Sequence, residues 1–236
     1  NSLWTQNPVW TEIGVRIPYT LTLVALSITL SVIFSIPIGV LSALKQDTWV
    51  DYSLRSFLIL GLSMPSFWFG MLLLMFTVSV FQWSPPLDYA PVHKDPITAL
   101  QQLFLPALAL GYRSAAVSAR MMRSSMLEVM REDYVRTAWA KGLRERVVVF
   151  THAARNAILP VVTLFALEII LIFSTAVVIE KIFNIPGLGR LLVDSITRRD
   201  VNMVQGLVTF TVAFVLGVNL LVDLVYAKLD PRIRFR

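Results

Sequence analysis

Long uncharged runs constrain the fold of this chain more than any other feature of its sequence. Ile17–Leu44 holds 28 consecutive residues without Asp, Glu, Lys or Arg, and Ser56–Leu87 holds 32. Val201–Val222 adds 22 more, and Asn156–Ile179 carries a single charge, Glu168, in 24 residues. Because a helix of about 20 apolar residues crosses the hydrocarbon core of a bilayer, these runs predict transmembrane helices.

A fifth span is expected from Pro96–Tyr112, where small apolar residues continue past Arg113. The sequence therefore predicts an all-α membrane protein, a polytopic bundle of five transmembrane helices. A soluble core does not fit, because the runs are too long and too many, and only 15% of the residues are charged against about a quarter in soluble domains. The expected spans are 17–44, 57–82, 97–120, 157–179 and 202–225.

Several kinds of chemistry are disfavoured by what the sequence lacks. There is no cysteine, so disulfides and thiolate catalysis are excluded. His93 and His152 lie far apart, in no spacing typical of a metal site. No phosphate loop, H-E-x-x-H or G-x-S-x-G motif occurs, so we expect no catalytic residue, no metal site and no bound cofactor.

The distribution of basic residues predicts an orientation. Of 21 Lys and Arg residues, 15 fall on one side of the five spans and 6 on the other. The more basic side is expected in the cytoplasm, which leaves the N-terminus outside and the C-terminus inside. The net charge of +6 thus marks topology, and no nucleic-acid partner is expected.

The segment of about 121–156, on the expected cytoplasmic side, is too polar to span and too long for a simple turn. Before and at its start, Arg113–Met130 reads as the third span running on past the membrane, with Arg120, Arg123 and Arg131 at or beyond the lipid headgroups. A second amphipathic piece follows further along, where Leu143, Val147 and Phe150 recur at helical spacing.

Between these parts, Asp133–Lys141 is expected to form a short helix. Glu132 and Asp133 suit the positive end of its dipole, and Gly142 suits a left-handed C-terminal cap. Tyr134 and Ala138 lie on one face, as do Val135 and Trp139. Such a helix fits either a groove on a partner protein or the membrane interface, and the composition favours neither.

The residues of this segment resemble the cytoplasmic coupling loop of binding-protein-dependent ABC importer permeases, in the dipeptide/oligopeptide/nickel branch, and most closely its first, B-type permease subunit. The similar stretches occur in order along nearly the whole chain. Where the wider superfamily has Glu-Ala-Ala, this chain has Arg136-Thr137-Ala138. The similar stretches are 122–129, 132–143, 155–163, 180–190, 219–226 and 229–234.

The resemblance implies the type I ABC importer permease fold for a single transmembrane domain of residues 1–236, with the family's first span missing. It implies a multi-pass protein of the bacterial inner membrane that forms half of a peptide pathway. The implied partners are a second permease subunit, two ATPase subunits that hold ATP and magnesium, an extracytoplasmic binding protein and membrane lipid. The residues implied in coupling to the ATPase are Asp133, Tyr134, Arg136, Thr137, Ala138, Ala140, Lys141 and Gly142.

Two further sites are expected on weaker grounds. Pro186, Gly187 and Gly189 lie in a turn-rich external segment, which is either a plain loop or a gate and contact for the binding protein. Glu168 lies mid-span, where a charge facing lipid is costly, so we expect it to face the pathway or the second permease subunit. It also leaves open an ion-coupled secondary transporter as the alternative function. The substrate itself, whether dipeptide, oligopeptide, glutathione or nickel, is not encoded in these motifs.

Overall fold

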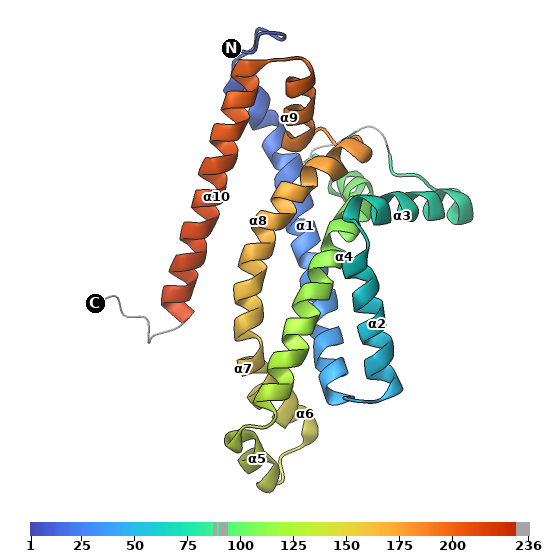
Figure 1. The fold of residues 1–236 in the computed structure, drawn as a ribbon, viewed down its shortest axis with the longest axis vertical. Helices are drawn as coiled ribbons and strands as arrows, with labels where there is room; N and C mark the ends of the chain where they lie inside the picture. The colour runs from blue at the N-terminus through green and yellow to red at the C-terminus, as the bar shows by residue number, and fades with distance from the viewer. Residues whose placement is uncertain (87–88, 90–93, 230–236) are drawn as a thin grey trace. The chain divides into compact units, whose positions relative to one another are not determined.

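The computed structural model describes residues 1–86, 89 and 94–229, without the side chains of 223 and 225–229. Every regular element among these residues is helical, which confirms the predicted all-α class (Figure 1). The elements are α1 (Val9–Leu44), α2 (Trp49–Ser63), α3 (Ser66–Phe81), α4 (Pro96–Val129), α5 (Asp133–Ala140), α6 (Glu145–Val147), the π-helix η1 (Val148–Ala154), α7 (Arg155–Ala157), α8 (Leu159–Ile182), α9 (Leu188–Thr197) and α10 (Val201–Leu229).

Three of the five predicted spans lie within single helices, the predicted span 157–179 is α8 apart from its first two residues, and the predicted span 57–82 is broken. Here α2 ends at Ser63 and α3 begins at Ser66, because Pro65 disfavours helical backbone at the preceding Met64. Among the described residues, three helices are long and apolar enough to cross a membrane: α1, α8 and α10. The count rises to four if α2 and α3 together form one bent span. Five spans therefore remain a prediction.

The prolines in the expected spans take two kinds of position. Pro18, Pro37 and Pro106 lie inside α1 and α4. Pro65 separates α2 from α3, and Pro160 is the second residue of α8, so neither is internal. These two prolines mark helix boundaries, where a missing backbone N–H is tolerated best.

The described residues form two compact units, and α1, α4 and α8 contribute residues to both. Unit 1 holds residues 1–27, 66–110 and 168 onward, and unit 2 holds residues 28–65 and 111–167. In unit 1, α9 turns back beside the start of α10 (Figure 1). The segment 180–200, expected as a turn-rich loop, thus contains a ten-residue helix.

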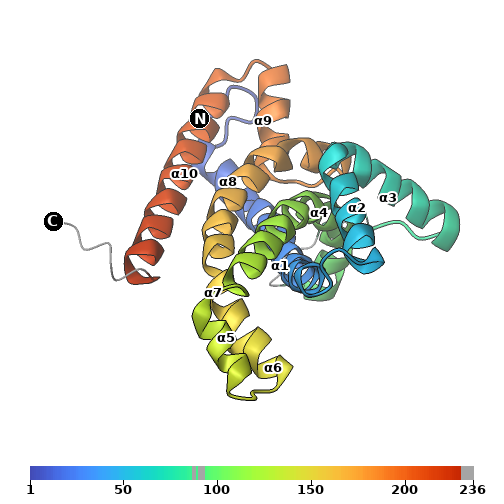
Figure 2. The ribbon, with the colours of Figure 1, turned by 60° about the horizontal axis from the view of Figure 1, so that its bottom comes forward.

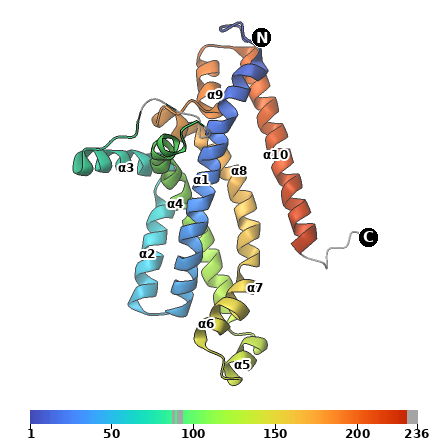
Figure 3. The ribbon, with the colours of Figure 1, turned by 180° about the vertical axis from the view of Figure 1, so that it is seen from behind.

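In unit 2 a short turn joins the end of α1 to α2 (Figure 3). Small residues let α1 and α4 approach closely: a Cβ added to Gly39 would lie 2.6 Å from Cβ of Met122. Ser31 donates a hydrogen bond to Ser114 at 3.0 Å across the same pair. Further along, α4 leads into α5, and α6 and η1 return beside it (Figure 2).

Candidate coupling site

The short helix predicted at 133–141 is present as α5, and its C-terminal cap forms as expected. Gly142 has a left-handed backbone, with φ of 74°. Its N–H donates to the carbonyl of Trp139 at 2.9 Å, and the N–H of Leu143 donates to that of Ala138 at 3.4 Å. This pair of bonds is the Schellman motif, which favours glycine at the left-handed position.

The apolar face of α5 points into unit 2. Val135 and Ala138 are buried against Val148 of η1, with Val129 and Met130 alongside. The sequence pattern placed Val135 and Ala138, with Tyr134 and Trp139, on faces that fit a partner groove or the membrane interface; in the structure Val135 and Ala138 are buried, and only Tyr134 and Trp139 are exposed. Packing against the returning η1 segment, which the sequence did not reveal, sets this rotation.

The outward face of α5 is polar with two aromatic side chains. Seven of the eight predicted coupling residues are exposed, and Ala138 is the exception. Asp133 and Arg136 form an exposed ion pair at 3.6 Å, of a kind that contributes little to stability. Tyr134 accepts a hydrogen bond at 2.8 Å from the side-chain amide of Asn156, just past η1. The exposed predicted residues are Asp133, Tyr134, Arg136, Thr137, Ala140, Lys141 and Gly142.

The start of α5 borders an open hollow of about 530 Å³ in unit 2. Acidic and basic side chains from the end of α4 and the turn line it. Such a polar, open hollow suits a contact with another polar surface. Its lining residues are Arg123, Ser124, Leu127, Glu128, Arg131, Glu132 and Asp133.

The second amphipathic piece folds differently from its prediction. The helical spacing of Leu143, Val147 and Phe150 holds only as far as α6, because residues 148–154 form a π-helix. All three apolar side chains are exposed, while Val148 and Val149 are buried. Extra residues of π-helix shift the register of a helix and are frequent at functional sites.

A buried ion pair, which the sequence did not suggest, holds the other side of unit 2 together. Asp51 of α2 is fully buried and accepts two hydrogen bonds from Arg123 of α4, at 2.8 and 3.0 Å. Arg123 was expected to meet anionic lipid at the headgroups, but its guanidinium instead contacts Asp51. The partners are 72 residues apart, so no local pattern could have paired them.

The predicted external residues lie around another buried carboxylate, in unit 1. Glu180 of α8 accepts a hydrogen bond from the hydroxyl of Thr20 at 2.6 Å and one from the N–H of Arg190 at 3.1 Å. A Cβ on Gly187 would collide with that carboxylate, and one on Gly189 with the backbone of Val177. Both glycines are therefore needed for close packing, which gives them a structural role whatever their part in a gate.

A cavity of about 220 Å³ adjoins this carboxylate in unit 1, with mostly apolar walls. Glu168 does not line it. Glu168 is buried in α8, at 7% exposure, and its predicted contact with the pathway or the second permease subunit stays a prediction. The cavity is lined by Thr20, Phe173, Ser174, Val177, Glu180, Leu188, Gly189, Leu192, Leu207 and Thr211.

The turn between α9 and α10 is tied to the N-terminal segment. Asp200 accepts hydrogen bonds from the hydroxyl of Ser2 and from the N–H groups of Leu3 and Met203, the last two at 3.1 Å. Burial alone would raise the pKa of Asp200, but together these hydrogen bonds lower it below its ordinary value. Asp200 thereby caps α10 and fastens the start of the chain.

Known proteins resemble this chain over nearly its whole length. The putative peptide transport system permease protein of Brucella abortus (strain 2308) is 40% identical over 99% of this chain and 74% of its own length. The dipeptide transport system permease protein DppB of Escherichia coli (strain K12) is 40% identical over 100% and 76%. The glutathione transport system permease protein GsiC of Pectobacterium atrosepticum is 40% identical over 100% and 74%.

Solved structures show the same fold at low identity. A chain of the MetNI methionine ABC transporter in an inward-facing conformation superposes with a TM-score of 0.78 at 14% identity, over 96% of this chain and all of that one. A chain of an amino acid ABC transporter gives 0.67 at 16%, over 92% and 94%. Residues 35–235 match the family described as "Binding-protein-dependent transport system inner membrane component". The chain belongs to this family, the permease subunits of ABC importers.

Proposed function

We propose that this chain forms half of the transmembrane pathway of an ATP-driven peptide importer and that α5 is its contact with an ATPase subunit. The carrying observation is α5 itself: a capped helix with its apolar side packed inward and seven of the eight predicted coupling residues outward. The proposal that the substrate is a peptide is supported by relatives named for peptide, dipeptide and glutathione transport.

The partners follow from the family. A second permease subunit completes the pathway, two ATPase subunits hold ATP and magnesium, and an extracytoplasmic binding protein delivers the substrate. In this arrangement the α5 side and the C-terminus face the cytoplasm, and α9 faces the binding protein. Closure of the ATPase dimer moves the paired α5 helices and switches the access of the pathway.

Uptake by the complete complex in proteoliposomes tests the function. We expect dipeptide uptake that requires ATP on the side of the membrane that carries the ATPase subunits. This uptake should persist when ionophores collapse the membrane potential. Uptake that collapses with the potential and ignores loss of the ATPase would instead support the ion-coupled secondary transporter.

Site-specific cross-linking tests the role of α5. A cysteine at Thr137 or Ala140 should form a cross-link to the ATPase, since both positions are exposed. A cysteine at Thr197, exposed at the end of α9, is the matched control and should form none. The reverse pattern would place α5 on the wrong side of the membrane for this function.

For Glu168, we propose contact either with a peptide amino group or with the second permease subunit. Glu168→Gln, assayed with substrates of different charge, separates the two. An equal effect on all substrates supports the subunit contact, and a charge-dependent effect supports the pathway.

A further inference from the structure

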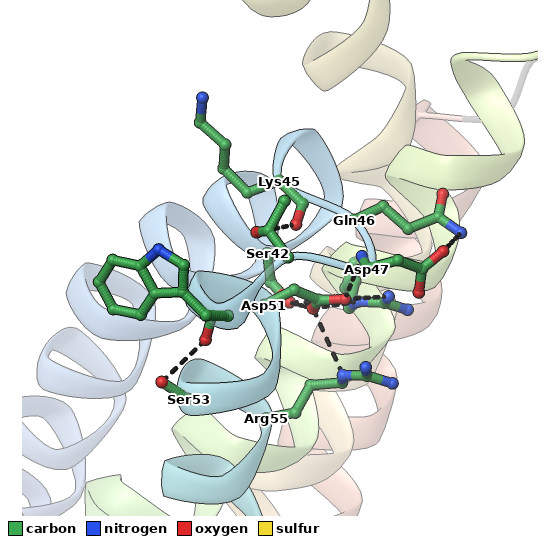
Figure 4. Close-up of polar contacts among 10 residues, drawn as sticks. Ser42, Lys45, Gln46, Asp47, Asp51, Ser53 and Arg55 are labelled. Atoms are coloured by element: carbon green, nitrogen blue, oxygen red, sulfur yellow. Dashed lines mark hydrogen bonds and ion pairs between the residues drawn. The ribbon is translucent and has the colours of Figure 1, made fainter.

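Asp51 is held by more donors than its own helix provides. Both carboxylate oxygens face Arg123, at 3.0 Å from Nε and 2.8 Å from an NH2 nitrogen. The hydroxyl of Ser42 donates at 2.5 Å and the N–H of Asp47 at 3.1 Å, and Arg55 lies at 3.4 Å. Figure 4 shows Ser42, Asp47 and Arg55 gathered around Asp51 at the turn between α1 and α2.

The carboxylate of this pair is shielded from water, although Arg123 also borders the open hollow beside α5. Asp51 is fully buried, and the side chain of Arg123 is 18% exposed, whereas that of Arg55 is 37% exposed. A two-point guanidinium–carboxylate contact fixes direction as well as distance. Removing one partner of such a pair leaves a charge without compensation, so the two helices cannot separate cheaply.

Arg123 lies close to the end of α4 that leads into α5. The neighbouring Met122 and Met126 are buried against Val40 and Ala43 of α1 and against η1. The chain then leaves α4 at Val129 and enters α5 at Asp133. The ion pair therefore fastens the α1–α2 turn to the helix end that carries α5, next to these apolar contacts.

We propose that Asp51 and Arg123 are positioning residues for coupling: their ion pair makes the α1–α2 turn follow α5 when an ATPase moves it. This inference rests on the proposed function of α5. Without the pair, the end of α4 can shift past the turn, so displacement of α5 is absorbed there and ATP hydrolysis no longer drives transport efficiently.

The first test measures ATP hydrolysed per substrate moved, in proteoliposomes that hold equal amounts of folded complex. Asp51→Asn and Arg123→Gln should raise this ratio about tenfold, with ATP hydrolysis itself near the wild-type rate. Arg120→Gln removes an exposed cation one turn earlier on α4 and should leave the ratio unchanged. Should the neutral variants fail to assemble, Arg123→Lys keeps the charge but loses the two-point contact, and should raise the ratio by a smaller factor.

A ratio equal to that of the wild type in folded variants, Arg123→Lys included, would overturn the proposal. So would transport that falls only in proportion to the amount of folded complex, because that marks a purely structural role. A wild-type complex without ATP-dependent uptake would instead refute the proposed function, so the two failures are distinguishable.

A second test measures whether the turn and α5 move as one body. Spin labels at Gln46 and Ala140, both exposed, report their separation in the full complex. The wild type should give one narrow distance distribution, and Asp51→Asn a broader one. A distribution unchanged by Asp51→Asn would contradict the mechanical link.

Discussion

Two carboxylates, Asp51 in unit 2 and Glu180 in unit 1, are both fully buried, yet they are held in opposite ways. Asp51 is neutralised by a guanidinium contacted at two points. Glu180 accepts from a hydroxyl and a backbone N–H, and the described residues give it no cation within ion-pair distance. The first arrangement joins two helices through opposite charges, whereas the second orders a turn through neutral donors. We expect the first to fail when its charge is removed and the second to fail when its space is filled.

The largest expected effect comes from removing the charge of Asp51. Asp51→Ala leaves Arg123 without a counter-charge and should lower the free energy of unfolding by about 3 kcal/mol. Glu180→Gln keeps one oxygen that can accept from the N–H of Arg190, and its amide nitrogen then faces the Thr20 hydroxyl, which can accept as well as donate, so we expect a loss of about 1 kcal/mol. Unfolding in mixed detergent micelles measures both. The double variant Asp51→Ala with Arg123→Met should recover part of the loss. Equal losses for the two single carboxylate variants would remove the distinction.

Filling the space beside Glu180 comes next. Gly187→Ala puts a methyl group where the Glu180 carboxylate lies and should cost about 2 kcal/mol through displaced packing. Gly217→Ala is the matched control, because a Cβ there meets nothing within 4 Å and alanine favours helix by up to about 1 kcal/mol. A loss of stability in Gly217→Ala as large as that in Gly187→Ala would contradict the packing argument.

A smaller effect on stability is expected at Gly142, where there is room for a side chain and only the left-handed backbone favours glycine. A Cβ there meets nothing within 4 Å, but a β-branched residue at positive φ costs about 1–2 kcal/mol. Gly142→Val should therefore disturb the end of α5 and abolish transport while insertion into the membrane is retained. Gly142→Asn, which tolerates this backbone, should transport nearly as well as the wild type. Normal transport by Gly142→Val would refute a role for the turn.

The smallest effect concerns Asp200, which, like Glu180, is held by uncharged donors. Because its pKa is lowered in the folded protein, it adds stability above the unfolded value of about 4, and this is lost as the pH falls through the lowered value. The protection of the amides of Leu3 and Met203 against hydrogen exchange, relative to their intrinsic exchange rates at each pH, should therefore fall on acidification. Asp200→Asn should show fast exchange already at neutral pH and little further change. Protection that is the same at both pH values in the wild type would rule out this role.

The sequence predicted well what depends on local pattern. The helix ranges around α1, α4, α8 and α10 followed from uncharged runs, and the cap at Gly142 followed from its place after Lys141. What it missed depends on contacts between distant segments: the inward rotation of α5 against η1, the pairing of Asp51 with Arg123, and the packing of Gly187 on Glu180. A proline that breaks a helix, such as Pro65, looks the same in the sequence as a proline tolerated inside a transmembrane helix. Only the surrounding structure distinguishes the two cases.

The inward turn of Val135 and Ala138 has a consequence for assembly. The exposed face of α5 is mostly polar, so this helix remains stable in water before a partner binds and after it dissociates. A contact that is made and released in every transport cycle benefits when its release exposes little apolar surface to water. Under the function proposed for α5, recognition of the ATPase then depends on shape and hydrogen bonding, and a substitution on the outward face changes that recognition without disturbing the packing of Val135 and Ala138.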